Sequence, residues 1–215
     1  MIDLDFAIDG VEIGRSSAVP VLNFKLLVSG TPPTLPVEHV ALQAQVRIEA
    51  AHRDYGAGER ERLAGLFGGA ADWDRSLRGL FWMTASAAIP AFEGECIVSL
   101  PVPCSCDATI AATKYFDAIE DGDAPLSFLF SGSVFYRGDD GGLQIAQIAH
   151  HKEAAFRLPV RLWREMMALY YPGCIWLPLG RDLFDEIDRY RRRHGLAAWE
   201  EALRRLVAHS RAEAM

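Results

Sequence analysis

Apolar and polar residues alternate along most of the first 150 residues of the chain. The alternation is clearest over 37–51, where every second residue from Val40 to Ile48 is apolar and Gln43, Gln45 and Arg47 lie between them. A strand with one buried face and one solvated face has this pattern. Further runs of period two occupy 3–8, 20–28, 84–103, 126–136 and 143–149. The pattern predicts an antiparallel β-sheet or sandwich of about six to eight strands.

Helical spacing replaces this alternation in two parts of the chain. Within 54–82, apolar residues recur three and four positions apart, which predicts a helical insertion between two strands. Three further amphipathic patterns fill 159–210 and end at glycine or proline residues, as helices commonly do. We therefore expect an α+β protein with a single domain over 1–215. It has a β-rich part at 1–150, which contains the insertion, and a helical part at 151–215 whose three helices pack on the sheet.

The composition mainly excludes classes of partner. The 215 residues carry 22 basic and 29 acidic side chains, a net charge of −7, whereas nucleic-acid binding requires a basic face. No apolar run approaches the roughly 20 residues that span a bilayer, and the first residues lack the features of a signal peptide. The four cysteines are expected to be free thiols in a cytoplasmic protein, because disulfides are rare in that compartment. We expect no nucleic acid, membrane or cofactor as a partner.

Two short motifs are candidates for a metal site. Cys104 and Cys106 are two residues apart, and thiolates at that spacing can converge on one soft ion. His150 and His151 could complete the set, although adjacent residues of a strand point to opposite faces. A structural zinc site needs four ligands, which the neighbouring sequence does not supply. We therefore assign no metal site and keep these four residues as candidates. The alternative is that both thiols lie in the core and both histidines at a strand end.

The sequence contains no recognisable catalytic motif. The glycine pairs lack the context and the Lys-Ser/Thr of a phosphate-binding loop, and no serine lies in a G-x-S-x-G turn. An enzyme would need a pocket assembled from distant residues, for example His39, His52 or Asp107. The sequence assigns no catalytic residue and favours a protein without enzymatic activity.

Aromatic residues give the best indication of a binding surface. Several of them crowd the helical part, and two more lie at the end of the insertion. Most aromatic residues in such positions pack between helices and sheet, and any that stay exposed would anchor a protein partner. The predicted partner contacts are Phe81, Trp82, Trp163, Tyr170, Tyr171 and Trp176.

Blocks along nearly the whole chain resemble an uncharacterised bacterial family, a domain of unknown function. They include Val46-Arg47-Ile48-Glu49, Leu100-Pro101-Val102-Pro103-Cys104, Ala112-Thr113-Lys114-Tyr115-Phe116, Lys152-Glu153-Ala154 and Arg157-Leu158-Pro159. Genes of that family often lie beside those of the actinobacterial-type high-affinity nickel–iron hydrogenase and its maturation factors. The resemblance implies an accessory role in assembling the hydrogenase, and it implies no reaction. Cys106 stands where the family pattern has an aromatic residue, so the resemblance does not support a metal site at the cysteines.

A shorter stretch is similar to the end of the SecB export chaperone, which holds unfolded clients on apolar grooves. It consists of Arg164-Glu165-Met166, Tyr171-Pro172, Leu177-Pro178-Leu179 and Phe184. This similarity implies that an apolar surface next to an antiparallel sheet binds a client.

Three hypotheses follow from the sequence. The first is a cytoplasmic, non-enzymatic accessory or chaperone-like protein that binds a protein client, such as a hydrogenase subunit or a maturation intermediate. The second is a metal-handling protein that uses Cys104, Cys106 and a histidine. The third is an enzyme whose pocket the sequence does not reveal. Self-association into a homo-oligomer is compatible with all three.

Overall fold

Contacts along the chain divide it into two compact units, Met1–Cys174 and Ile175–Met215, and each is described by itself. The structure, a computed structural model, describes residues 2–69, 73, 77–105, 109–138, 141–174 and 179–213. The expectation of a single domain over 1–215 stays a prediction.

Strands dominate the described residues of the first unit. In chain order its elements are β1 (Asp3–Ile13), β2 (Val21–Thr31), β3 (Val37–Ile48), η1 (Ala50–His52), α1 (Ala57–Phe67), β4 (Leu80–Ile89), β5 (Glu95–Pro103), α3 (Ile110–Ala118), β6 (Asp123–Arg137), β7 (Leu143–Gln147), β8 (Glu153–Pro159) and α4 (Val160–Tyr170).

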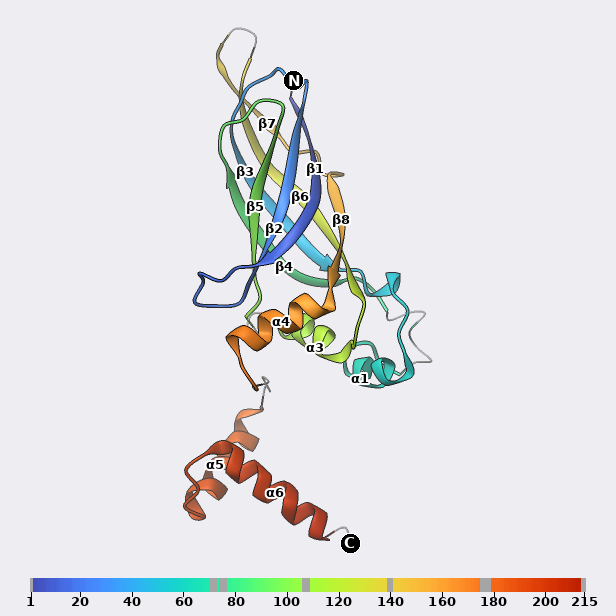
Figure 1. Ribbon diagram of the computed structural model, residues 1–215, viewed down its shortest axis with the longest axis vertical. Coiled ribbons are helices and arrows are strands. Elements are labelled where there is room, and N and C mark those ends of the chain that lie inside the picture. Colours follow the sequence, from blue (N-terminus) through green and yellow to red (C-terminus); the bar gives the residue numbers. More distant parts are fainter. Residues whose placement is uncertain are drawn as a thin grey trace. The chain divides into compact units, whose positions relative to one another are not determined.

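The strands form two antiparallel sheets (Figure 1). The smaller sheet has the order β1-β2-β5, and the five-stranded sheet has the order β4-β3-β6-β7. Strand β8 also pairs with β6, along a different stretch from β7. The predicted α+β class with antiparallel sheets is confirmed.

An apolar core lies between the two sheets. Alternate residues of β2 from Leu22 to Val28 are fully buried, and so are alternate residues of β3 from Val40 to Ile48, as the alternation predicts. Phe24 of the smaller sheet meets Phe128 of the larger one edge-on, with 5.0 Å between the ring centroids. Such an aromatic pair contributes about 0.5–1.5 kcal/mol beyond the burial of its surface. The core therefore ties the two sheets together.

Helices α3 and α4 close one end of this sandwich, away from β7 (Figure 1). Phe116 of α3 stacks on Trp163 of α4 with 4.3 Å between ring centroids. Trp82 of β4 lies 5.8 Å from Trp163, and all three rings are buried. The closed end is therefore an aromatic cluster contributed by one strand and two helices.

A polar cluster attaches α1 to α3. Arg53 and Glu59 form an ion pair with 2.8 Å between nitrogen and oxygen, and Glu59 also accepts the backbone N–H of Glu120 at 2.8 Å. Tyr55 and Tyr115 share a hydrogen bond of 2.9 Å between their hydroxyls. Burial is the main cause that raises the pKa of both phenols, so both stay protonated hydrogen-bonding groups.

Three predicted boundaries were wrong. Residues 80–82 belong to β4 rather than to the helical insertion. The run at 84–103 contains two strands, β4 and β5, with a turn at Gly94, where φ is +72°. Residues 153–159 form β8, so the sheet extends into the part that was predicted to be helical. This last error arose because Ala154-Ala155 fits the spacing of a helix as well as that of a strand, and because Pro159 suits the first turn of a helix.

The second unit is a helical hairpin of α5 (Arg181–Arg193) and α6 (Trp199–Glu213). Phe184 stacks on Trp199 with 4.8 Å between ring centroids, and the guanidinium of Arg191 lies 4.8 Å from the centre of the same Trp199 ring. Asp188 accepts hydrogen bonds from Arg191 and Arg192, which hold the pKa of its carboxyl below the ordinary value. Helices α4, α5 and α6 are the three that the sequence predicts for 159–210.

Gly132 allows β6 to approach β3 closely. Its φ is +142°, and a Cβ added there would lie 2.0 Å from the carbonyl oxygen of Ala41. Gly132→Ala should therefore lower the free energy of unfolding by about 3 kcal/mol or more, because the two backbones must separate. Gly65→Ala is the control, since no atom lies within 4 Å of that position in α1. It should stabilise the protein by up to about 1 kcal/mol. Urea unfolding measures the free energy of unfolding of both variants. An unchanged value for Gly132→Ala would contradict the close approach of β6 to β3.

Candidate functional site

The outer face of the five-stranded sheet carries the side chains that β3 turns away from the core. Arg47 of β3 lies opposite Phe81 of β4 on one side and opposite Ser127 of β6 on the other. Ser127 in turn lies opposite Ala155 of β8. Directly opposed residues of antiparallel strands share a face, so these four form one row across the outer face.

A cavity of about 650 Å³ lies over this row. Its floor is low because the paired Ser127 and Ala155 have small side chains. Longer side chains surround this floor, namely Arg47, Glu49, His52, Leu129, Glu153 and Arg157. Small residues ringed by long ones produce a hollow in an otherwise regular sheet. Its volume falls in the range of sites that bind small ligands or single side chains.

Polar groups of the cavity converge from two neighbouring strands. The Glu49 carboxylate accepts a hydrogen bond from the Ser127 hydroxyl at 2.5 Å. The other oxygen of Glu49 and the guanidinium of Arg47 both lie against Gly79, where an added Cβ would be 2.9 Å and 3.4 Å from them. The Nε of Arg47 is buried and has no hydrogen-bond partner. This donor is therefore unsatisfied within the protein and closed to solvent.

The hydrogen bond of Ser127 does not prepare this serine as a nucleophile. Ser127 donates its proton to a carboxylate, whereas a serine activated for attack donates to a histidine that a third group orients. His52, one of three residues named for a pocket built from distant residues, lines the same cavity. Of the two other residues named for such a pocket, His39 lies beside Phe135, with 6.0 Å between ring centroids, and Asp107 lies outside the described residues.

The same face continues toward β7 over further hollows. Small side chains of β3, β4 and β6 line a hollow of about 540 Å³, among them Ala41, Ser86, Ala88 and Ser133. Beyond it, Ile145 of β7 lies opposite Phe135 of β6, next to Leu143. Ile145 and Leu143 are each 61% exposed. Eight residue steps of β3 separate Arg47 from His39, which corresponds to about 26 Å at about 3.3 Å per residue.

Phe81 and Trp82 point to opposite sides of β4, as adjacent residues of a strand do. Phe81 is 55% exposed beside Arg47, and it stays a candidate partner contact. Trp82 is 3% exposed and Trp163 is 1% exposed. Because both fill the closed end of the sandwich, they are core residues, and this removes them from the predicted partner surface.

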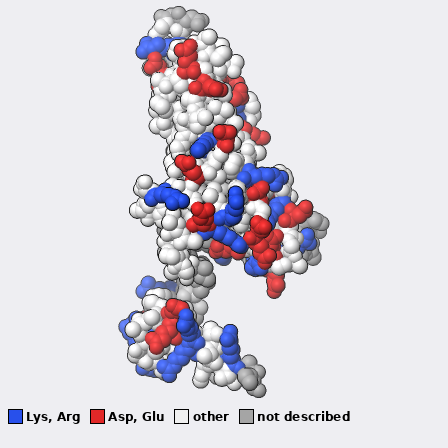
Figure 2. All heavy atoms as spheres, viewed as in Figure 1, with Lys and Arg blue, Asp and Glu red and all other residues white. Residues whose placement is uncertain are grey.

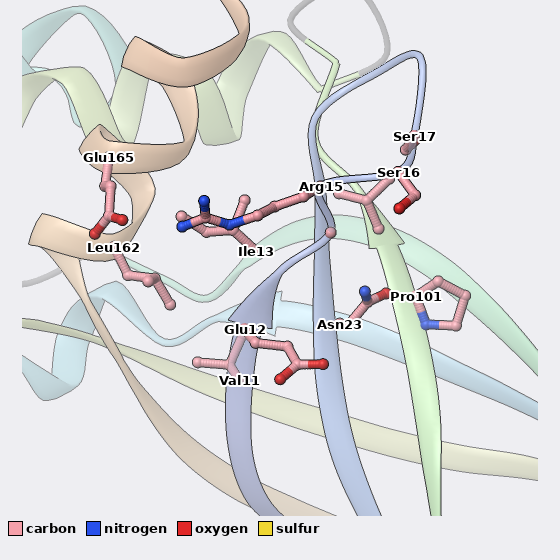
Figure 3. A pocket seen from close by; sticks show the side chains of 12 residues that line it. Val11, Glu12, Ile13, Arg15, Ser16, Ser17, Asn23, Pro101, Leu162 and Glu165 are labelled. Atoms are coloured by element: carbon pink, nitrogen blue, oxygen red, sulfur yellow. The ribbon is translucent and has the colours of Figure 1, made fainter.

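A second hollow, of about 800 Å³, lies between α4 and the turn that follows β1 (Figure 3). Tyr170 of α4 is not part of its lining, but its hydroxyl donates to the carbonyl of Gly14, which is, and this hydrogen bond ties α4 to the turn. Figure 3 shows Arg15 extending from the turn toward α4, where Leu162 and Glu165 face the same hollow. Four of its twelve lining residues, Gly14 to Ser17, belong to the turn, and the others come from β1, β2, β5 and α4.

Two further predicted partner contacts lie at the end of the first unit and beyond it. Tyr171 follows the last residue of α4 and is half-buried. Trp176 lies outside the described residues. The partner roles of Tyr170, Tyr171 and Trp176 stay predictions.

The candidate metal ligands do not form a cluster in the part of the chain that the structure describes. Cys104 is fully buried, and its thiol donates to the carbonyl of Val102 at 3.1 Å. Cys106 lies outside the described residues. His150 and His151 occupy the exposed turn before β8, with 5.9 Å between their ring centroids. Among the described residues, no group of three or more His, Cys, Asp or Glu side chains could hold a metal ion.

Sequence reasoning missed the charged residues of the cavity. Arg47 was assigned to the polar face of the strand at 37–51, which was a usable signal. Glu153 and Arg157 could not be placed, because β8 was not predicted and its pairing with β6 was unknown.

Acidic and basic side chains lie intermixed on the visible surface, most clearly around α1 (Figure 2). The surface in this view therefore mixes both signs of charge rather than presenting a field of one sign.

The fold defines an α+β protein built on two antiparallel sheets. The chain belongs to the family of unknown function DUF6084, whose model matches residues 1–215. This confirms the expected membership of an uncharacterised family. No curated protein matches the chain. A comparison with solved structures found the solution structure of a candidate late embryogenesis abundant (LEA) protein, 14% identical over 73% of this chain and 71% of that chain, with a TM-score of 0.30. At this TM-score the likeness carries no argument.

No helix in the described ranges is both long enough and apolar enough to cross a membrane.

Thiol reactivity tests the placement of the cysteines. Cys104 is fully buried, whereas Cys174 is exposed. In the native protein, iodoacetamide should therefore alkylate Cys174 at least about tenfold faster than Cys104. Mass spectrometry after timed exposure measures both rates, and the urea-unfolded chain is the control in which both thiols react alike. Rapid labelling of Cys104 in the native chain would show that its core position is wrong.

Proposed function

We propose that this protein is a non-catalytic accessory protein that binds an extended segment of a protein client along the outer face of its five-stranded sheet. The observation that carries this proposal is the distribution of side chains on that face. Exposed apolar side chains stand at its two ends, and hollows floored by small residues lie between them.

The exposed apolar residues provide anchoring positions for a client. Phe81 stands beside the cavity, and Leu143 and Ile145 stand at the far end of the face. Exposed aromatic and aliphatic side chains gathered on one face are typical of protein-binding surfaces. A solvated sheet face without a partner would carry polar residues at such positions.

The shape of the face favours an extended client over a globular one. The hollows follow one another along β3 for about 26 Å, which matches about eight residues of an extended chain. Small residues such as Ala41 and Ser133 let a client backbone approach the sheet, while the hollows accept its side chains.

The identity of the client is proposed from the resemblance of the sequence blocks. Genes of the family they resemble lie beside those of a nickel–iron hydrogenase, so the proposed client is a hydrogenase subunit or a maturation intermediate in the cytoplasm. The similarity to the end of SecB supports a chaperone-like mode, in which an apolar surface holds a segment that has not reached its final fold.

Substitutions on the outer face test this proposal. Phe81→Ser and Ile145→Ser should each reduce co-purification with the hydrogenase subunits by about tenfold or more, because each removes an apolar anchor. Ile97→Ser is the matched control, since Ile97 of the smaller sheet is also 61% exposed. The measurement is the amount of each subunit retained by the tagged full-length chain after co-expression.

Two outcomes would end the proposal. If the wild-type chain retains none of the hydrogenase subunits, these subunits are not its client. If Phe81→Ser and Ile97→Ser reduce co-purification equally, the outer face is not the binding surface.

A further inference from the structure

Strand β7 is the open edge of the sandwich among the strands that the structure describes. The other edge strands lie beside one another, since β1 runs along β8 and β4 runs along β5. Strand β7 ends the five-stranded sheet, and within the described strands it pairs with β6 alone. Helices α3 and α4 close the opposite end of the sandwich (Figure 1). The side of β7 away from β6 therefore has no strand along it in the described part of the chain.

The backbone of β7 directs hydrogen-bonding groups toward this open side. Directly after the strand, the N–H of Ile148 donates to the carbonyl of Gly132 at 3.0 Å, so residue 148 faces β6. Backbone groups of successive residues in a strand point to alternate sides, so the even-numbered residues of β7 face β6 as well. The N–H and C=O groups of Leu143, Ile145 and Gln147 therefore face away from β6. They present donors and acceptors in the order that another strand requires.

This edge lacks the features that usually prevent the addition of a strand. Natural edge strands are commonly protected by charged residues, prolines or bulges. Strand β7, described over its whole length, has the sequence Leu-Gln-Ile-Ala-Gln and no register shift against β6. By contrast, the edge strand β1 carries Asp3 and Asp5, which bind Lys152 of the turn before β8. Strand β4 is also uncharged, but β5 lies beside it.

Two of the three residues that face the open side also expose apolar side chains. Leu143 and Ile145 are each 61% exposed, and both side chains stand on the outer face of the sheet, where Ile145 lies opposite Phe135. A strand added beside β7 would cover part of both side chains and would satisfy the open backbone groups. An exposed, uncharged edge of this kind is typical of a site where another strand adds.

The pattern of β7 favours a second copy of the same strand as the occupant. Two identical strands can pair antiparallel about a twofold axis at Ile145. Ile145 then lies opposite its own counterpart, and Leu143 lies opposite Gln147 of the other copy. All three outward-facing residues exchange backbone hydrogen bonds in this register, about six in total. Because β7 is uncharged, no like charges meet across the axis, whereas a charged edge would repel its own copy.

We propose that two copies of this chain associate through β7, so that their five-stranded sheets join into one continuous antiparallel sheet. The outer faces of both copies then form a single surface, with Ile145 of each copy at its centre. Since the added strand lies in the plane of the sheet, it leaves the hollows over β3 and β6 uncovered. This proposal goes beyond client binding and does not depend on it.

Sedimentation of the purified full-length chain, without any client, measures the association. An edge of five residues is small beside a standard protein interface, so the dissociation constant should lie in the micromolar range. Between about 1 µM and about 300 µM, the average mass should rise from one chain toward two. A chain that stays monomeric over this whole range would overturn the proposal.

Charges introduced at Ile145 test the register. Ile145→Lys and Ile145→Asp should each weaken self-association by at least about tenfold, because each places two like charges opposite one another across the axis. An equimolar mixture of the two variants should form dimers again, since the lysine of one copy then faces the aspartate of the other. Ile97→Lys is the matched control, because Ile97 of the smaller sheet is also 61% exposed, and it should leave the association unchanged.

Hydrogen exchange of the wild-type chain keeps the test independent of how the variants fold. At the upper end of the concentration range, the amides of Leu143, Ile145 and Gln147 should exchange at least about threefold more slowly than at the lower end. The amides of Gln144 and Ala146 face β6, so their protection should not depend on concentration. Exchange is read residue by residue by mass spectrometry with fragmentation of the labelled chain.

Several further results would contradict pairing through β7. A dimer that persists in Ile145→Lys, or a mixture of the two charged variants that stays monomeric, would show that Ile145 does not face its counterpart. Slow exchange of the three outward-facing amides at every concentration would show that the chain itself covers this edge. Protection of these amides by a hydrogenase subunit, in a chain that does not self-associate, would assign the edge to the client instead.

Discussion

Alternation along β3 is the constraint on which the rest of the structure depends. Its inward residues from Val40 to Ile48 are almost completely buried between the two sheets. A shift of one residue would move all of them to the solvent, so packing of the core fixes the register. The same register then places Gln43, Gln45 and Arg47 on the outer face. Since β3 pairs with β4 on one side and β6 on the other, it also sets which residues of those strands stand beside them.

Strand β6 is long enough to pair with two further strands on the side away from β3. Its residues from Asp123 to Leu129 pair with β8, and its residues from Ser133 to Arg137 pair with β7. One strand therefore contributes Ser127 to the cavity and Phe135 to the apolar end of the face. Gly132 lies between these stretches, where β6 comes closest to β3. Core residues beneath the site hold it in place, and one of them, Leu126, also lines the cavity, which is how a sheet can present a fixed surface.

Local sequence patterns were sufficient for the fold class but not for the site. The alternation of β3 and the spacing of α4, α5 and α6 are properties of consecutive residues, so they can be found in one sequence. The row that floors the cavity joins residues 47, 127 and 155 through pairings between strands far apart in the chain. No local pattern encodes such pairings. The aromatic candidates could not be sorted into core and surface for a related reason, because Phe81 and Trp82 could be told apart only once residues 80–82 were known to be a strand.

Two cations of the larger sheet's strands and turns differ in how far the protein satisfies their donors. Lys152, before β8, is largely buried and binds Asp3 and Asp5 of β1 at 2.7 Å and 2.8 Å. These hydrogen bonds raise its pKa, so the ammonium is satisfied within the protein and joins β1 to β8. The buried Nε of Arg47 has no such partner. An unsatisfied buried donor costs about 1–3 kcal/mol, a sizeable share of a typical net stability of about 5–15 kcal/mol. Arg53 carries a second such donor, since its Nη1 is buried without a partner although its Nη2 pairs with Glu59. The fold therefore tolerates this cost at more than one arginine.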